Sequence, residues 1–336
     1  MFPRPYLALD RLSVDGLTED DVRESLLPLI RSNHYTVDQE RGIVRVEGPD
    51  TSYHEIDPFL DQGLSYCRID RSKQDPAGFH ISTPLFDVCL EDSWCGFFLA
   101  GRIAHLPPEM PLIIIHLDDH TDMMSTLLLA GEHLTDPFTG EQFFADNPQC
   151  WPGAIASGAV GIGSFLTPFF SLARRLHIAH LSDGPGHAGL YNVEPSVIRH
   201  PLLESTGFFD INLDPNDDRF VSLRTYSKSD DPVRLIEGAS ADRSTYVVVH
   251  IDLDYFINDF NGNPAPDSYQ PSPELQTAAL DKMDAFFDAL KGRRVNVDRW
   301  MIATSPGFCS GYHWEFLIEA LSTRIRSCAR PRSGRR

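Results

Sequence analysis

The sequence predicts an α/β fold with a mostly parallel sheet, and three apolar segments carry this prediction. Each is rich in β-branched residues and ends in polar ones: PLIIIHLDDHTD (111–122), TYVVVHIDLD (245–254) and RWMIATSPG (299–307). Apolar runs of this kind are typical of strands that are buried on both faces of a sheet. Helices are expected between the strands at 164–177 and 273–291. In such sheets, ligands bind beyond the carboxyl ends of the strands, where the polar residues stand.

The beginning of the chain predicts a small unit of helix and strand. Residues 18–31 are expected to form a helix with Thr18 as N-cap, acidic residues in the first turn, and Pro28 ending or kinking it. RGIVRVEG (41–48) alternates as a short strand does. We therefore expect three parts along the chain: a small N-terminal α+β element at 1–80, a larger domain at 81–325 and a basic flexible tail at 326–336.

Composition and charge exclude several classes of protein. The formal net charge is -19, with 48 acidic against 29 basic residues, which argues against a nucleic-acid partner. No apolar run reaches the length of a membrane span, and the first residues lack the pattern of a secretory signal. Six cysteines without a CxxC spacing predict reduced thiols and a cytoplasmic protein. The oligomeric state stays open.

Two acidic motifs follow two of the predicted strands and predict a metal site. Because side chains alternate along an extended chain, Asp118, His120 and Asp122 project to one side, and so do Asp252 and Asp254. These groups repel one another unless cations lie between them, and two divalent ions offset the repulsion better than one. Oxygen and nitrogen donors without a thiolate suit manganese or a similar divalent ion.

A third acidic stretch, DINLDPNDDRF (210–220), predicts a surface loop. The spacing of Asp210, Asn212 and Asp214 resembles the start of an EF-hand loop. Pro215 and Val221 replace the glycine and the bidentate glutamate that such a loop needs, so we expect no calcium site there.

The two metal motifs resemble those of a known enzyme superfamily. HLDDHTDM (116–123) resembles the D-A-H-x-D motif of the arginase/agmatinase (ureohydrolase) family, and HIDLDYF (250–256) resembles its second D-x-D motif. HIDLDYF and GAVGIGSFLTP (158–168) are most similar to the UPF0489 branch, which includes peptide arginases that convert arginine to ornithine within ribosomally made precursor peptides. The resemblance covers residues 85–325 and implies an arginase- or deacetylase-like three-layer sandwich.

The resemblance also implies a ligand set. Asp118 and Asp252 would bridge two manganese ions, with Asp122 on one ion and His120 and Asp254 on the other. The metal would activate water as the nucleophile.

One ligand of the family is missing from this chain. In LEDSWCGF (90–97), Ser93 or Trp94 stands where the family carries a further ligand histidine. Asp92, another residue or water would then replace it. Two ions are expected, and a single ion is the alternative.

The resemblance assigns roles to two further residues. His133 would relay protons, and Glu315 would bind the guanidinium group, while the alternatives are a surface histidine and a solvated glutamate in the first turn of a helix. His116 and His250 would be either donors to the ligand carboxylates or buried core histidines. Met124 stands where arginases place an asparagine that holds the α-carboxylate of free arginine, which suits a peptide substrate or agmatine.

The expected activity is manganese-dependent hydrolysis of arginine side chains in a precursor peptide, with release of urea and formation of ornithine. The partner is then an arginine-containing peptide, which the N-terminal element is expected to contact. Two alternatives remain: a hydrolase of a small guanidino compound such as agmatine, and a non-catalytic, metal-stabilised peptide-binding protein. A zinc-dependent deacylase is disfavoured because the paired histidines of that group are missing from the sequence.

Overall fold

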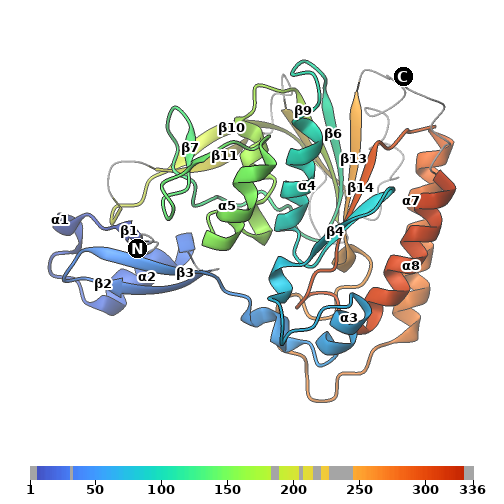
Figure 1. The fold of residues 1–336 in the computed structure, drawn as a ribbon, viewed down its shortest axis with the longest axis horizontal. Coiled ribbons are helices and arrows are strands. Elements are labelled where there is room, and N and C mark those ends of the chain that lie inside the picture. The colour runs from blue at the N-terminus through green and yellow to red at the C-terminus, as the bar shows by residue number, and fades with distance from the viewer. Residues whose placement is uncertain are drawn as a thin grey trace.

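The computed structural model describes residues 6–30, 33–182, 189–203, 207–214, 221–226 and 245–328. Its main feature is a nine-stranded sheet in the order β11-β10-β12-β9-β6-β13-β14-β5-β4 (Figure 1). The six strands from β12 to β5 pair in parallel, and antiparallel strands extend both edges. The bounds are β4 (His80–Ser82), β5 (Phe86–Cys89), β6 (Leu112–Leu117), β9 (Leu176–Leu181), β10 (Gly189–Ile198), β11 (Phe208–Asp214), β12 (Val221–Tyr226), β13 (Tyr246–Asp252) and β14 (Arg299–Ala303). The prediction of an α/β fold with a mostly parallel sheet is confirmed.

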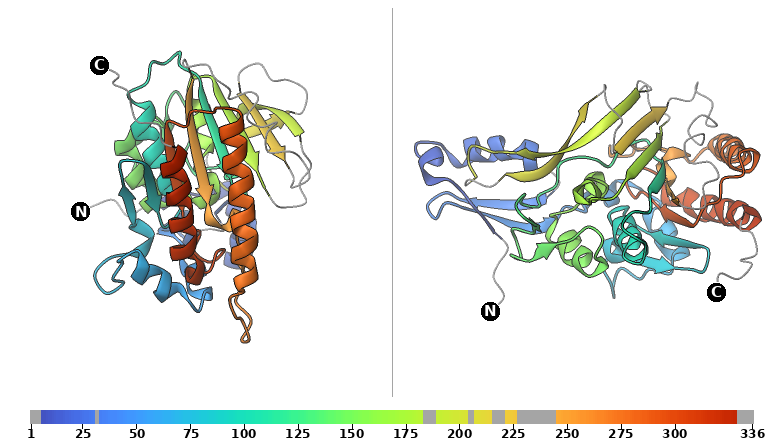
Figure 2. Two further views of the ribbon diagram at one scale, coloured as in Figure 1. Left: turned by 90° about the vertical axis from the view of Figure 1, so that its right-hand side faces the viewer. Right: turned by 90° about the horizontal axis from the view of Figure 1, so that it is seen from above.

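Each face of this sheet packs against its own helices. Ile114 and Val248 join the core under α4 and α5, whereas Ile115 and Val249 join the core under α7 and α8. Because successive side chains of a strand point to opposite faces, strands covered on both sides have unbroken apolar sequences. The helices are α3 (Leu60–Tyr66), α4 (Ser93–Ile103), α5 (Trp151–Ser157), α7 (Pro273–Gly292) and α8 (Gly311–Cys328). Figure 2 shows α7 and α8 running side by side.

A small N-terminal unit lies at the opposite end of the molecule from α7 and α8 (Figures 1 and 2). It consists of β1 (Tyr6–Ala8), α1 (Arg11–Val14), α2 (Glu19–Ile30), β2 (Asn33–Asp38) and β3 (Ile43–Pro49), with the strands in the order β1-β3-β2. Thr18 caps α2: its hydroxyl accepts from the Asp21 N–H, and the Asp21 carboxylate accepts from the Thr18 N–H. Pro28 lies inside the helix, which continues to Ile30.

The small unit ends earlier than the sequence suggested. Its sheet stops at Pro49, and the chain then forms η1 (Ser52–Ile56) and α3, which packs on α8 of the large domain. The three-stranded sheet of the small unit therefore ends well before residue 80, while the domain boundary itself stays a prediction. The cause is that residues 52–66 bury their apolar side chains against the large domain, as Leu60 and Leu64 do.

Three local predictions differ from the structure. The helix expected at 164–177 is wrong: η5 (Thr167–Ser171) is a short 3₁₀ helix, and β9 already begins at Leu176. The surface loop expected at 210–220 is wrong for its first part, because residues up to Asp214 belong to β11. The tail expected from residue 326 is still helical up to Cys328, and 329–336 lie outside the described residues.

The remaining elements are short. They are η2 (Pro76–Gly78), β7 (Leu134–Thr135), β8 (Gln142–Phe143), η3 (Pro148–Cys150), η4 (Ile162–Ser164) and η6 (Leu253–Tyr255). All six cysteines are free thiols, in agreement with the sequence prediction. Within the described ranges, no helix combines the length and apolarity needed to cross a membrane.

The crossing of α3 and α8 depends on glycine. A Cβ atom on Gly63 would lie 2.4 Å from Cε3 of Trp314 and 2.8 Å from Cα of Gly311. We expect Gly63→Ala to lower the free energy of unfolding by about 2 kcal/mol because the added methyl group overpacks this contact. Gly153→Ala in α5 is the matched control: its Cβ would meet nothing within 4 Å, so the higher helix propensity of alanine should stabilise slightly. Urea denaturation measures both, and equal effects would contradict the prediction.

Candidate metal centre

The carboxyl ends of β6 and β13 bring the two acidic motifs together. These strands are parallel neighbours with Leu117 opposite Ile251, so Asp118 and Asp252 emerge beside each other. Ligand atoms of Asp92, Asp118 and Asp252 all lie within 4.8 Å of one another. Such convergence follows from strand order, because the carboxyl ends of parallel strands meet at one edge of the sheet.

A second group of ligand atoms shares Asp118 with the first. Asp118, His120 and Asp254 again lie within 4.8 Å of one another. His120 Nδ1 is 3.1 Å from Asp254 Oδ2 and 3.4 Å from Asp118 Oδ1. The ring's other nitrogen, Nε2, lies 3.3 Å from Asn261 Oδ1, a contact that fixes the ring orientation.

Asp122, the remaining residue predicted as a ligand, joins the same cluster. It is buried and belongs with Asp118, His116 and His250 to a third group of close ligand atoms. Its backbone has a φ of 53°, a conformation that costs energy for a residue with a side chain and is concentrated at functional sites. The structure thus brings together all five residues that the sequence proposed as metal ligands.

Three carboxylate oxygens of the cluster are buried without a hydrogen-bond partner in the described part of the chain. They are Asp92 Oδ1, Asp118 Oδ2 and Asp122 Oδ2. A buried, unpartnered carboxylate oxygen is costly, and buried charges in proteins are normally paired or bind metal. The donor set is rich in oxygen. It contains the partly exposed imidazole of His120 and no thiolate, and it therefore fits manganese or magnesium better than zinc.

The electrostatics of the cluster point in the same direction. Burial, followed by the charge of Asp254, raises the pKa of Asp118 to about 7. Burial also raises the pKa of Asp92, Asp122 and Asp252 well above the usual value. The carboxylates of Asp118 and Asp254 raise the pKa of His120 to about 11. Protons and a metal ion therefore compete for the same atoms.

This competition predicts that metal binding strengthens as pH rises. A pKa of about 7 for Asp118 lies above its usual 3.8, so the metal-free protein loses stability as pH rises through this range, and the cost of the ionised form is complete above it. A raised histidine pKa stabilises the metal-free protein at low pH and loses this effect as pH rises. Mn²⁺ should therefore raise the melting temperature more at about pH 8 than at about pH 6, with Kd falling about tenfold per pH unit for each displaced proton. Thermal unfolding at both pH values measures this; a gain independent of pH would contradict it.

A row of three buried histidines underlies the ligands. His180, His116 and His250 occupy the same register position on β9, β6 and β13. His116 and His250 share a hydrogen bond of 2.7 Å between their Nδ1 atoms, and His180 Nε2 lies 2.9 Å from the Asp118 carbonyl oxygen. Burial lowers the pKa of His250 to about 3 and of His180 to about 4, so both rings are neutral. The row positions the backbone that carries Asp118 and His120.

Two side chains near the cluster are candidates for a further metal ligand. His116 Nε2 is 3.5 Å from Asp122 Oδ2 and 3.2 Å from the His120 carbonyl oxygen, and its other nitrogen is bonded to His250. Asp92 instead has an oxygen without a partner and belongs to the first ligand group. Of these two candidates, Asp92 is the one with a ligand atom that lacks a partner among the described residues, so it is the better candidate.

A cavity of about 420 Å³ opens onto the cluster. It is lined by Tyr53, Glu91, Asp92, Asp119, His120, Thr121, Asp122, Met124, Ile162, Gly163, Asp252, Ser305, Pro306 and Phe308. Five of these are carboxylates, and none of these lining residues is a lysine or arginine. The lining therefore suits a cationic group at the end where the metal ligands lie, and an apolar stem against Met124, Ile162 and Phe308.

The chain matches no protein-family model and no curated protein sequence.

The structure does not bring His133 and Glu315 to this cavity. His133 is exposed before β7 and packs on the Phe144 ring, because backbone pairing of Leu129 with Thr135 and Phe208 holds this loop at the surface. Glu315 is exposed on α8, because the buried neighbours His313 and Trp314 turn it away from the core. Neither residue lines the cavity, and their expected roles stay predictions.

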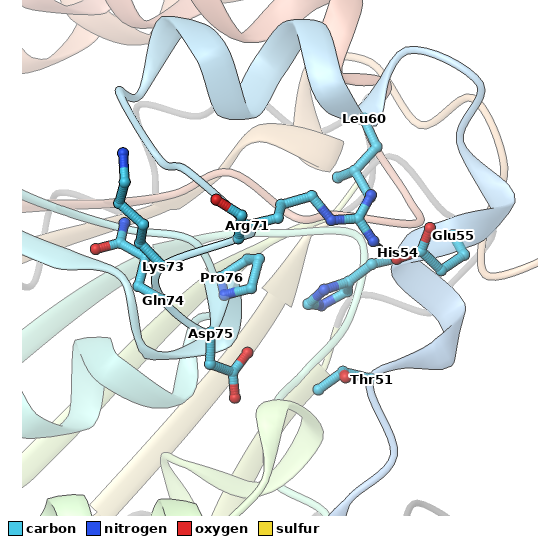
Figure 3. A pocket seen from close by; sticks show the side chains of 10 residues that line it. Thr51, His54, Glu55, Leu60, Arg71, Lys73, Gln74, Asp75 and Pro76 are labelled. Atoms are coloured by element: carbon cyan, nitrogen blue, oxygen red, sulfur yellow. Dashed lines mark hydrogen bonds and ion pairs between the residues drawn. The ribbon is translucent and has the colours of Figure 1, made fainter.

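A second cavity, of about 480 Å³, lies against residues 51–60 and 71–76 (Figure 3). Arg71 reaches across it to ion pairs with Glu55 and Asp61. The ring of His54 also borders it, while His54 Nε2 lies 3.0 Å from Oε1 of Glu91, which lines the cavity beside the ligand cluster. His54 thus stands between the two cavities.

Proposed function

We propose that this protein is a metal-dependent amidinohydrolase that converts arginine side chains within a peptide to ornithine and releases urea. One observation carries the proposal: two groups of buried ligand atoms share Asp118, and Asp92, His120 and Asp252 of these groups line an acidic cavity. A carboxylate shared in this way suits a pair of divalent ions, which is the arrangement that many metallohydrolases use. The resemblance of both motifs to ureohydrolases, and with it the three-layer arginase-like architecture, belongs to the same proposal.

The residues divide between two metal positions. Asp92, Asp118, Asp122 and Asp252 would hold one ion, and Asp118, His120 and Asp254 the other. When bound, the ions supply the Lewis acidity that makes water a nucleophile near neutral pH. The manganese assignment rests on the oxygen-rich donor set.

The protein's own residues prepare the rest of the reaction. The acidic lining attracts the guanidinium cation, and the apolar wall around Met124 and Phe308 displaces water from its stem. Asn258 donates a hydrogen bond to Asp119 at 3.2 Å, and Asp119 N–H donates to Asp254 Oδ1, which together hold the ligand loop in place.

The cavity favours a substrate without a free carboxylate. Met124 is 45% exposed at the cavity wall and cannot donate a hydrogen bond to a carboxylate. The described lining offers no lysine or arginine for this purpose either. An arginine inside a peptide meets this requirement, because its carboxyl carbon forms an amide. Agmatine meets it as well and is the second candidate.

A substrate panel tests the proposal. The manganese-loaded protein is incubated with an arginine-containing peptide, the same peptide with lysine in place of arginine, free arginine and agmatine. Loss of CH₂N₂ from the arginine peptide with release of one urea per event is the expected result. Turnover of agmatine alone would assign the second candidate. Binding of the peptide without urea release, at full metal occupancy, would overturn the hydrolase and favour a binding protein.

A further inference from the structure

One buried carboxylate in the cavity belongs to neither group of metal ligands. Glu91 follows β5, directly precedes Asp92, and is 4% exposed. It lines the cavity together with the ligand residues. A buried glutamate is normally paired with a cation or serves a site.

The contacts of Glu91 engage only one of its oxygens. The Tyr53 hydroxyl donates to Oε1 at 2.9 Å, and His54 Nε2 lies 3.0 Å from the same oxygen. Both partners belong to η1, and Tyr53 is held in turn by Gly307, where a Cβ would meet the Tyr53 carbonyl oxygen at 2.5 Å. Oε2 has no hydrogen-bond partner among the described residues. The carboxylate is therefore fixed at one oxygen and available at the other.

Among the described residues, no lysine or arginine neutralises Glu91. None of the cavity-lining residues is a lysine or arginine, and the ion pairs described for Glu91 involve His54 alone. Because the remaining charge faces a cavity rather than bulk water, it is suited to a cation that enters from outside. Of the five carboxylates that line the cavity, Asp92, Asp122 and Asp252 belong to the metal cluster and Asp119 accepts a hydrogen bond from Asn258. Glu91 is therefore the carboxylate that can serve such a cation.

The surroundings of Glu91 fit a flat cation on an apolar stem. The Tyr53 and Phe308 rings pack edge to face at 6.2 Å, and both line the cavity. Met124 and Ile162 supply further apolar surface. A guanidinium group is planar, donates paired hydrogen bonds to a carboxylate and packs well against aromatic rings, whereas an ammonium group is a compact point charge.

We propose that Glu91 binds the guanidinium group of the arginine side chain and so determines specificity for arginine. The inference rests on the proposed function, since it places the substrate in the cavity beside the metal ligands. It replaces the exposed Glu315 in the role that the sequence assigned to it. Tyr53 and His54 act as positioning residues that hold Oε1.

The test separates recognition of the cation from turnover. Binding of an arginine-containing peptide is compared with binding of the same peptide carrying citrulline, which has nearly the same shape but no charge. The wild-type protein should prefer arginine, and Glu91→Gln should reduce this preference about 10- to 100-fold, the range expected for a buried, paired, charge-assisted contact. Glu315→Gln is the matched control and should leave the preference unchanged. Tyr53→Phe should reduce the arginine preference less, because Glu91 keeps its charge and Oε1 loses only the hydrogen bond from the Tyr53 hydroxyl.

The outcomes distinguish this inference from the proposed function. Urea release by the wild type together with an unchanged arginine preference in Glu91→Gln would overturn the role of Glu91 and leave the hydrolase standing. Absence of urea release together with loss of the preference in Glu91→Gln would overturn the hydrolase and leave the guanidinium site standing. Metal content and melting temperature of each variant are measured alongside, and a Glu91→Gln protein that loses metal would show that Glu91 serves the metal centre instead.

Discussion

Asp118→Asn should abolish tight binding of divalent metal and lower urea release at least about 1,000-fold. Asp118 is fully buried and is the residue common to the two ligand groups. Asparagine keeps the size of the side chain but removes the charge and turns an N–H donor toward cations, which its neighbours cannot compensate. Elemental analysis of metal content and quantification of urea measure the two effects.

Folding should survive this change. In the metal-free protein, Asp118→Asn removes one of several carboxylates that repel one another, so its melting temperature should equal or exceed that of the metal-free wild type. Asp281→Asn, an exposed position on α7, is the matched control and should retain metal and activity. Full turnover by Asp118→Asn would disprove the metal centre as described.

The strands that carry the metal ligands were predictable because of how they are buried. β6, β13 and β14 are covered on both faces, so their sequences are unbroken apolar runs that stand out from the rest of the chain. β9 is covered in the same way, but the segment before it is rich in phenylalanine and leucine, and its sequence pattern predicted a helix at 164–177. Pro168 within η5 and the burial of Phe169 and Phe170 explain why 3₁₀ turns form there instead.

The site was predictable only where it follows a predicted strand. The five ligand residues could be placed together because the carboxyl ends of two parallel strands must meet. Glu91 and Asp92 follow β5, whose four residues, FDVC, include Asp87 and so form no apolar run that would stand out. Tyr53 and His54 come from a distant segment, and their place beside Glu91 depends on tertiary packing that no local pattern encodes.

Spacing along the chain could not show that the side chains of His133 and Glu315 lie outside the cavity. Glu315 has the distance along the chain that the ureohydrolase resemblance requires, yet the side on which it lies is decided by which neighbours α8 buries. His313 and Trp314 are fully buried, and a residue following them on the helix faces away. A motif therefore locates a residue on an element, whereas the burial pattern of that element decides where its side chain points.

Asp92→Asn should separate the two metal positions. The partnerless Oδ1 of Asp92 lies within the group that contains Asp118 and Asp252, and the other group lacks Asp92. We therefore expect this variant to retain about one manganese ion per chain in place of two and to lose about 100-fold in turnover, as for damaged metal sites. Metal analysis gives the stoichiometry, and loss of the magnetic coupling between two Mn²⁺ ions in electron paramagnetic resonance gives a readout that does not depend on activity.

His116→Ala supplies the comparison that this prediction needs. If Asp92 replaces the missing histidine, His116→Ala should weaken metal binding only through the ligand backbone that the histidine row holds, and both ions should still bind at high manganese concentration. Retention of two coupled ions by Asp92→Asn, with loss of one ion in His116→Ala, would instead assign the nitrogen donor to His116. His116 Nε2 lies 3.5 Å from Asp122 Oδ2, close enough for both atoms to bind one ion. Asp92 is favoured because a bonded imidazole must give up a hydrogen bond to bind metal, whereas the partnerless Oδ1 of Asp92 gives up none.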